Sequence, residues 1–229
     1  MKINLYVNYK KNIYKNRKII VRYLVFLVAL LYFSMFFWIF FYSPYDALQG
    51  ILVKIIYIHV PCAWLSMASY FLMGIFAILY VTYKNIFYDI IVHSLSIVSL
   101  HSCIVALVTG SIWGKAAWGT FWVWDARLTS MLLQALILLL SLILRSVKER
   151  FASSIFAVIG LINIPIIKFS VASWNTLHQP SSFSLTRNSS IDSAFLTPLF
   201  YCTLSIALFY FMITIIIINK HLINLNKNA

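Results

Sequence analysis

Residues 113–127 contain the highest density of side chains suited to binding a large planar ligand. The segment reads WGKAAWGTFWVWDAR and holds four of the chain's seven tryptophans. The residues with binding potential are Trp113, Gly114, Trp118, Gly119, Trp122, Trp124, Asp125 and Arg127. Each glycine follows a tryptophan, where a missing side chain lets a flat ligand approach the backbone. A membrane-interface aromatic belt is usually spread over several helix ends, so we interpret this segment as an aromatic platform.

One histidine precedes this platform in the sequence and another follows it. His59 lies in YIHVPCAW, and His178 lies in the polar stretch SWNTLHQPSS. Taken alone, each histidine is more typical of an interfacial hydrogen-bonding residue than of a ligand. Together, two neutral imidazoles from separate loops can approach opposite faces of a porphyrin iron while tryptophans cover the apolar edges. We therefore predict a haem site with His59 and His178 as the axial metal ligands.

The propionates of such a ligand require cations nearby. Lys115, Arg127 and Arg187 lie in the segments around the platform, and the sequence leaves open which of them pairs with the propionates. Two further histidines, His93 and His101, lie about 12 Å apart along one helix, whereas two axial nitrogens on one iron are about 4 Å apart. We expect these two to form interhelical hydrogen bonds. His221, near the C-terminus, is expected to be inert.

Six apolar runs must position these residues. Of the 229 residues, 62% are hydrophobic and 10% are charged, whereas soluble domains carry about a quarter charged residues. The runs span residues 19–42, 58–83, 86–112, 128–144, 151–171 and 195–218. Each is long enough to cross a hydrocarbon layer of about 30 Å as a helix, and none alternates as a barrel strand does. The expected fold class is an all-α integral membrane protein with six transmembrane helices.

The basic residues predict the direction of these helices. Thirteen of the 18 lysines and arginines fall on one side if the N-terminus is cytoplasmic or in the matrix, as the positive-inside rule requires. Both termini are then inside, and the platform and both ligand histidines are outside. We divide the chain into a basic leader at 1–18, a membrane domain at 19–218 with the Trp-rich loop 113–127, and a tail at 219–229. We expect the leader and first run to form a retained signal anchor.

Several functional classes are disfavoured. The basic excess is mostly a topology signal and a contact with lipid headgroups, so we expect no nucleic acid partner. Cys62, Cys103 and Cys202 lie far apart and form no CxxC or CxxCH motif, which disfavours a zinc site, a redox pair or covalent haem attachment. The sequence contains no recognisable nucleotide-binding loop, so an ATP-driven step needs another subunit. Two alternatives stay open: a permease subunit for another small solute, and a haem lyase.

The segment GSIWGKAAWGTFWVWDARLT, residues 110–129, resembles the tryptophan-rich WWD signature of haem-handling membrane proteins. Within that superfamily, YIHVPCAW and FSVASWNTLHQ resemble the two histidine segments of the CcmC family, the haem exporter protein C subunits of System I cytochrome c maturation. The likeness runs from about residue 22 to residue 218. The chain length, the six spans and the two outer histidines favour CcmC over its larger relatives CcmF and CcsA.

This resemblance implies a function. Members of the family hold b-type haem transiently at the outer face of the bacterial inner membrane or on the intermembrane-space side of the mitochondrial inner membrane. It implies His59 and His178 as axial ligands, and the WWD segment as support for haem and as a contact for the haem chaperone CcmE. It also implies the small subunit CcmD and the ABC transporter CcmA/CcmB as partners, with ATPase activity in the transporter. Composition is compatible with an organelle-encoded or a bacterial protein.

Overall fold

A computed structural model describes residues 2–174, 176–178 and 192–228, and the side chains of residues 19–174, 176–178 and 192–225. This part of the chain consists of helices and their connections, without a β-strand. The elements in chain order are α1 (Lys2–Phe41), the 3-10 helix η1 (Ile51–Ile55), α2 (Ile56–Tyr83), α3 (Ile86–Trp118), α4 (Ala126–Ser146), α5 (Arg150–Ile159), the 3-10 helix η2 (Gly160–Ile162), α6 (Asn163–Ser173) and α7 (Ser193–Asn228).

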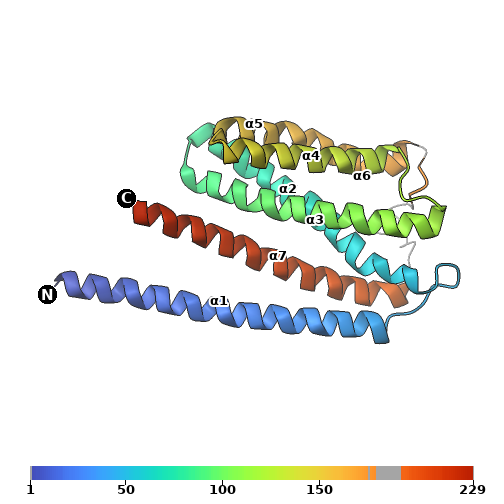
Figure 1. Ribbon diagram of the computed structural model, residues 1–229, viewed down its shortest axis with the longest axis horizontal. Helices are drawn as coiled ribbons and strands as arrows, with labels where there is room; N and C mark the ends of the chain where they lie inside the picture. Colours follow the sequence, from blue (N-terminus) through green and yellow to red (C-terminus); the bar gives the residue numbers. More distant parts are fainter. Residues whose placement is uncertain (1, 175, 179–191, 229) are drawn as a thin grey trace.

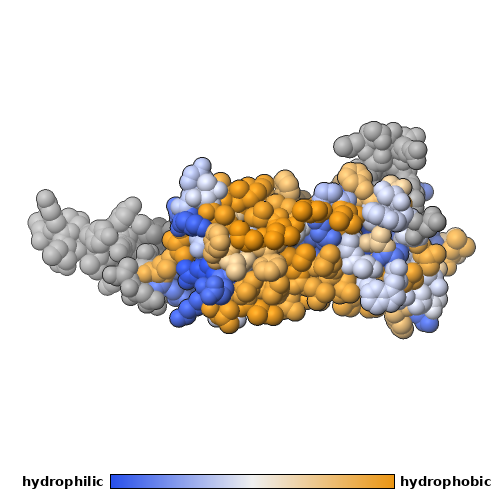
Figure 2. Space-filling model, turned by 90° about the horizontal axis from the view of Figure 1, so that it is seen from above, coloured by the Kyte–Doolittle hydropathy of each residue, from blue (hydrophilic) through white to orange (hydrophobic). Residues whose placement is uncertain are grey.

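Six of the helical segments in the described residues are long and apolar enough to cross a membrane. They cover Ile19–Phe41, Ile51–Tyr83, Ile86–Trp118, Ala126–Ser146, Arg150–Ser173 and Ser193–Leu225. Figure 2 shows a band of hydrophobic surface around the middle of the molecule, with hydrophilic residues gathered on either side of it. The sequence-based prediction of six membrane-spanning helices is confirmed.

The helices lie roughly parallel or antiparallel, and the N- and C-termini emerge at one end of the bundle, here called the terminal end (Figure 1). The α2–α3 and α4–α5 connections lie at this end as well. At the opposite end, the site end, lie the α1–α2 connection, the α3–α4 connection, the end of α6 and the start of α7. The three segments that carry the expected haem ligands and platform therefore meet at one end of the bundle.

The α2–α3 hairpin forms the centre of the structure because α3 packs against α2, α4 and α7. A tight turn joins the two helices: Lys84 adopts a left-handed conformation, and the Asn85 side chain accepts a hydrogen bond from the Phe87 amide, which caps α3. More than half of the α3 span is buried, compared with 17% of the α1 span. The centre of the core therefore lies along α3, and α1 lies at the edge, where it packs mainly on α7.

The fifth span is broken into α5, η2 and α6. Pro165 lies in the first turn of α6 and lacks the backbone donor that would bond one turn back, which favours a break in the helix just before it. Gly160, at the start of η2, lets α2 approach: a Cβ there would lie 1.9 Å from the Tyr70 hydroxyl oxygen. That hydroxyl donates to the Ala157 carbonyl at 3.2 Å, which joins the two spans.

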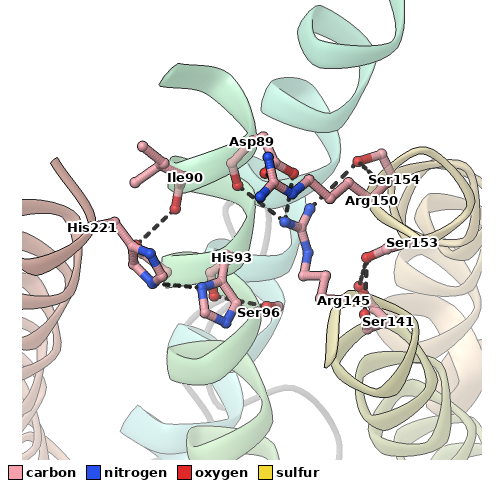
Figure 3. A network of polar contacts seen from close by, with 11 residues as sticks. Asp89, Ile90, His93, Ser96, Ser141, Arg145, Arg150, Ser153, Ser154 and His221 are labelled. Atoms are coloured by element: carbon pink, nitrogen blue, oxygen red, sulfur yellow. Dashed lines mark hydrogen bonds and ion pairs between the residues drawn. The ribbon is translucent and has the colours of Figure 1, made fainter. Parts of the chain in front are cut away.

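Histidine side chains of α3 form hydrogen bonds with α7. His101 Nδ1 lies 2.8 Å from the Tyr210 hydroxyl, and His93 Nδ1 lies 2.9 Å from His221 Nε2. Figure 3 shows the second pair between the two helices. The expectation that His93 and His101 form interhelical hydrogen bonds is confirmed. The expectation that His221 is inert is wrong, because α7 continues past the predicted span and brings this ring against His93.

Candidate haem site

His59 lies in the first turns of α2, with its ring held against α3. Its Nδ1 is 2.9 Å from the carbonyl oxygen of Ala106. A carbonyl only accepts hydrogen bonds, so Nδ1 carries the proton and Nε2 keeps its lone pair. Metal-binding histidines commonly have this second hydrogen bond, which fixes the tautomer and the ring direction. The hydrogen bond to the Ala106 carbonyl therefore leaves the Nε2 atom of His59 as the nitrogen that could bind a metal.

Gly110 makes room for the His59 ring. A Cβ at this position would lie 2.8 Å from the ring's Cε1 atom and 3.2 Å from Nδ1, closer than carbon atoms approach without displacement. The ring consequently packs directly on the backbone of α3. Sequence reasoning did not assign a function to Gly110, although this residue begins the segment with the WWD resemblance.

A short hydrogen-bonded chain connects His178 to the start of α4. The backbone N–H of His178 donates to Thr176 Oγ1 at 3.0 Å, and the Thr176 hydroxyl donates to Asp125 Oδ2. The other carboxylate oxygen of Asp125 accepts from the Leu128 amide at 2.8 Å, which caps the N-terminus of α4. Asp125 therefore acts on the site through Thr176, a residue that sequence reasoning missed and for which the sequence offered no signal.

The two histidine rings meet at the site end. Their centroids are 6.3 Å apart, with an interplanar angle of 37°. Two imidazoles on opposite sides of one metal ion would have centroids about 6 Å apart, because each metal–nitrogen bond is about 2 Å long. The separation thus fits two axial ligands on one iron, although the residues are 119 positions apart in the chain.

Three of the four tryptophans surround these rings. Trp113 meets His59 edge-on at 5.8 Å and donates from Nε1 to the Gln49 side-chain oxygen at 2.6 Å. Trp118 lies 6.1 Å from His178, and its ring packs on Gly114, where a Cβ would be 3.0 Å away. Gln49 orients Trp113 from the α1–α2 connection, a contact that no sequence pattern indicated.

Trp122 and Trp124 differ in their position despite being two residues apart. Trp122 lines the pocket, and its Nε1 is buried without a hydrogen-bond partner among the described residues. Trp124 is 77% exposed and packs edge-on against the outer part of Trp122, with ring centroids 5.6 Å apart. Neither Trp124 nor Gly119 belongs to the described pocket lining. Gly119 instead ends α3 with a positive φ of 77°, a conformation that favours glycine.

Part of the loop predicted at residues 113–127 is helical. α3 continues through Gly114 and Trp118 and ends at Gly119, and α4 begins at Ala126. Only residues 119–125 lack regular helical structure. Trp113, Gly114 and Trp118 are therefore placed by a helix, and Arg127 by the first turn of another. His59, expected in a loop, likewise lies within α2.

The pocket between these residues has a positively charged wall. Arg127 lines this pocket. Two ion pairs are found among the described residues; both lie at the terminal end, and neither includes Arg127. Lys115 is exposed and donates to the Gly119 carbonyl at 2.8 Å, outside the described lining. Arg187 lies outside the described residues. Arg127 and the Trp122 N–H thus provide a cation and a donor suited to a carboxylate.

The pocket is small for a macrocycle. Its volume is about 90 Å³. Pockets that surround a small molecule typically hold about 300–1,000 Å³. A macrocycle gripped by the two histidines would accordingly keep much of its edge outside the protein.

Comparison with known proteins shows the family of this chain. Residues 5–229 match the family described as Heme exporter protein C, CcmC. The chain belongs to this family. The CcmC resemblance predicted from the tryptophan and histidine segments is therefore confirmed.

Relatives of the CcmC chain occur in mitochondria and in bacteria. A mitochondrial ccmC-like protein of cytochrome c biosynthesis from Marchantia polymorpha is 46% identical over 170 residues, which are 74% of this chain and 72% of that protein. Heme exporter protein C of Bradyrhizobium diazoefficiens is 40% identical over 173 residues, 73% of this chain and 66% of the relative. The Escherichia coli K12 protein of the same name is 40% identical over 168 residues, 71% and 67% of the two chains.

The neighbouring tryptophans of this CcmC chain offer a matched pair of variants. We expect Trp122→Phe to weaken haem binding about tenfold, because it removes a buried donor worth about 1.5 kcal/mol to a charged acceptor. Trp124→Phe should leave the affinity within about twofold, because this ring is exposed. Haem titrations of the two purified variants measure the difference. Equal affinities would show that the Trp122 N–H does not contact the ligand.

Proposed function

We propose that this protein binds b-type haem transiently at the site end and presents it to the haem chaperone CcmE during cytochrome c maturation. His59 and His178 serve as axial iron ligands. The observation that carries the proposal is the 6.3 Å separation of two imidazoles from distant parts of the chain. The names of the curated relatives, which refer to haem export and cytochrome c biosynthesis, support the same function.

The surrounding residues have distinct functions in this proposal. His59 offers the Nε2 lone pair because its Nδ1–H is bonded to Ala106. Trp113 and Trp118 cover the apolar faces of the haem, and Gly114 lets the Trp118 ring lie close to α3. Arg127 and Trp122 Nε1 bind a propionate. Asp125 positions His178 through Thr176.

The incomplete enclosure of the pocket suits presentation rather than storage. The exposed edge of the bound macrocycle would be accessible to CcmE, and Trp124, which is exposed beside Trp122, offers an apolar contact for that chaperone. The small subunit CcmD and the ABC transporter CcmA/CcmB complete the assembly, and ATP hydrolysis belongs to the transporter. Two histidine ligands keep the iron six-coordinate and limit its reaction with oxygen until transfer.

The sidedness of the site follows from charge. Thirteen of the 18 lysines and arginines lie toward the terminal end, which therefore faces the cytoplasm or the matrix under the positive-inside rule. The site end then faces the periplasm or the intermembrane space. We therefore propose that haem is delivered on the outer side of a bacterial or mitochondrial inner membrane.

The buried polar residues of the central span argue against a permease. A polar route through the bundle would need side chains that face a common path. Ser94 and Ser102 on α3 instead donate to backbone carbonyls of their own helix, at 2.8 and 2.9 Å. Their hydroxyls are satisfied locally and do not require a solute.

A haem titration of the purified protein in detergent tests the proposal. We expect one haem per chain and the absorption spectrum of a six-coordinate, low-spin iron with two histidine ligands. The matched control is the same titration with metal-free protoporphyrin IX, which cannot use the axial ligands and should bind more weakly. A five-coordinate spectrum at full occupancy would contradict the two-ligand assignment.

A further inference from the structure

A second pocket lies at the terminal end of the bundle, far from the histidine pair of the haem site. It has a volume of about 570 Å³, which falls within the range of small-molecule sites. Its walls come from the beginning of α3, the end of α4, the start of α5 and the last turns of α7. The function proposed above does not use this pocket.

One wall of the pocket has more positive than negative charge. Asp89 forms a buried ion pair with Arg145 at 2.5 Å, and Arg150 Nε approaches the other carboxylate oxygen at 3.6 Å (Figure 3). One carboxylate thus faces two guanidinium groups. Arg150 is half-exposed and keeps donors available for another acceptor.

A buried donor of the same wall also lacks a partner. The Arg145 side chain is only 6% exposed, and its Nε has no hydrogen-bond partner among the described residues. Its terminal nitrogens bond the Asp89 carboxylate and, at 3.5 Å, the Ser154 hydroxyl. A buried N–H without a partner is costly, and an oxygen anion in the pocket would be a suitable acceptor.

The rest of the pocket is apolar. Ile90 and Ile97 of α3, Leu142 of α4 and Leu225 of α7 line it. The His93–His221 hydrogen bond joins α3 and α7 along another part of the lining. A ligand that satisfies both parts has an acidic group for the arginines and an apolar body for the aliphatic side chains.

We propose that this pocket binds an amphiphile by its acidic oxygens, with Arg150 and Arg145 as the anion-binding residues. Two membrane components share this chemistry: the phosphate of an acidic phospholipid and the carboxylates of a porphyrin. If the ligand is a porphyrin, the inference rests on the proposed haem function. The pocket would then be a site where haem is loaded, at the membrane face opposite to its delivery. The phospholipid source is independent of that function.

Two variants of the full-length protein test the pocket, one by charge and one by shape. Arg150→Gln removes the half-exposed cation, and Lys148→Gln removes an exposed cation outside the described lining as its control. Leu142→Trp fills the pocket, and Leu139→Trp places the same ring at an exposed position of α4. Far-UV circular dichroism checks that all four variants keep their helical content.

Two probes separate the sources. Phosphatidylglycerol retention is measured by native mass spectrometry after release from phosphatidylcholine nanodiscs that contain a minor fraction of this lipid. Metal-free protoporphyrin IX binding is measured by fluorescence. Arg150→Gln and Leu142→Trp should each weaken the binding of one probe about fivefold, and the probe affected identifies the source. If both variants bind both probes as well as their controls do, the proposal is overturned, while the iron spectrum at the haem site would be unaffected.

Discussion

His59→Ala and His178→Ala are each expected to remove the six-coordinate haem spectrum of the purified protein. Each variant loses one of the two proposed axial iron–nitrogen bonds, so the iron becomes five-coordinate and haem affinity falls by about a hundredfold or more. The absorption spectrum and a haem titration measure both effects. Helical content should stay unchanged, because His59 contributes one hydrogen bond to a backbone carbonyl and His178 lies between helices.

His101→Ala is the matched control for these variants. It also removes a histidine that hydrogen-bonds to another helix, through Tyr210 at 2.8 Å, but this histidine is exposed, lies in the middle of α3 and is outside the described pocket lining. We expect it to keep the two-histidine spectrum. A full six-coordinate spectrum in either ligand variant would contradict the assignment of that histidine to the iron.

Thr176→Val should weaken haem binding about tenfold to thirtyfold while preserving the fold. Valine has the shape of threonine but neither accepts from the His178 amide nor donates to Asp125, so two hydrogen bonds of about 1 kcal/mol each are lost. Because both bonds act on the position of His178, the loss should appear in haem affinity and in the fraction of six-coordinate iron. Thr176→Ser keeps the hydroxyl and should restore both.

A control at the same end of the bundle separates this positioning effect from a general effect of valine. Thr129 lies in the first turns of α4 and is exposed. Thr129→Val makes the same chemical change there and should leave the spectrum as it is. If Thr176→Val also binds haem with the original affinity, the chain from Asp125 to His178 does not hold the ligand in place.

The six spans were predictable because lipid imposes one simple requirement, about 20 apolar residues per helix. The meeting of His59 and His178 was predictable in outline. His59 stands at the start of the second predicted span and His178 follows the fifth, and these two positions were expected at the same membrane face. Their 6.3 Å separation depends on how α2 packs on α3 and on the contact between Thr176 and Asp125. Such tertiary contacts have no local sequence pattern.

The Trp-rich segment shows where pattern reasoning stops. Its aromatic density indicated a platform but not which rings face the pocket. Trp122 and Trp124 lie in residues 119–125, which form neither a helix nor a strand. Without a regular repeat, the sequence does not indicate which of the two side chains faces the pocket. Trp113 and Trp118 were expected in a loop because tryptophan and lysine lower the mean hydropathy of the stretch after residue 112. α3 nevertheless extends through Trp118 and ends at Gly119.

The incomplete enclosure of the site has a kinetic consequence. A ligand that is fully surrounded leaves at a rate set by its own dissociation, independent of the acceptor. Here the pocket has a volume of only about 90 Å³, too small to surround a macrocycle, so an acceptor would touch the bound macrocycle before either proposed axial iron bond breaks. We therefore expect handover to proceed through a ternary complex, with a rate that rises with acceptor concentration until the encounter saturates.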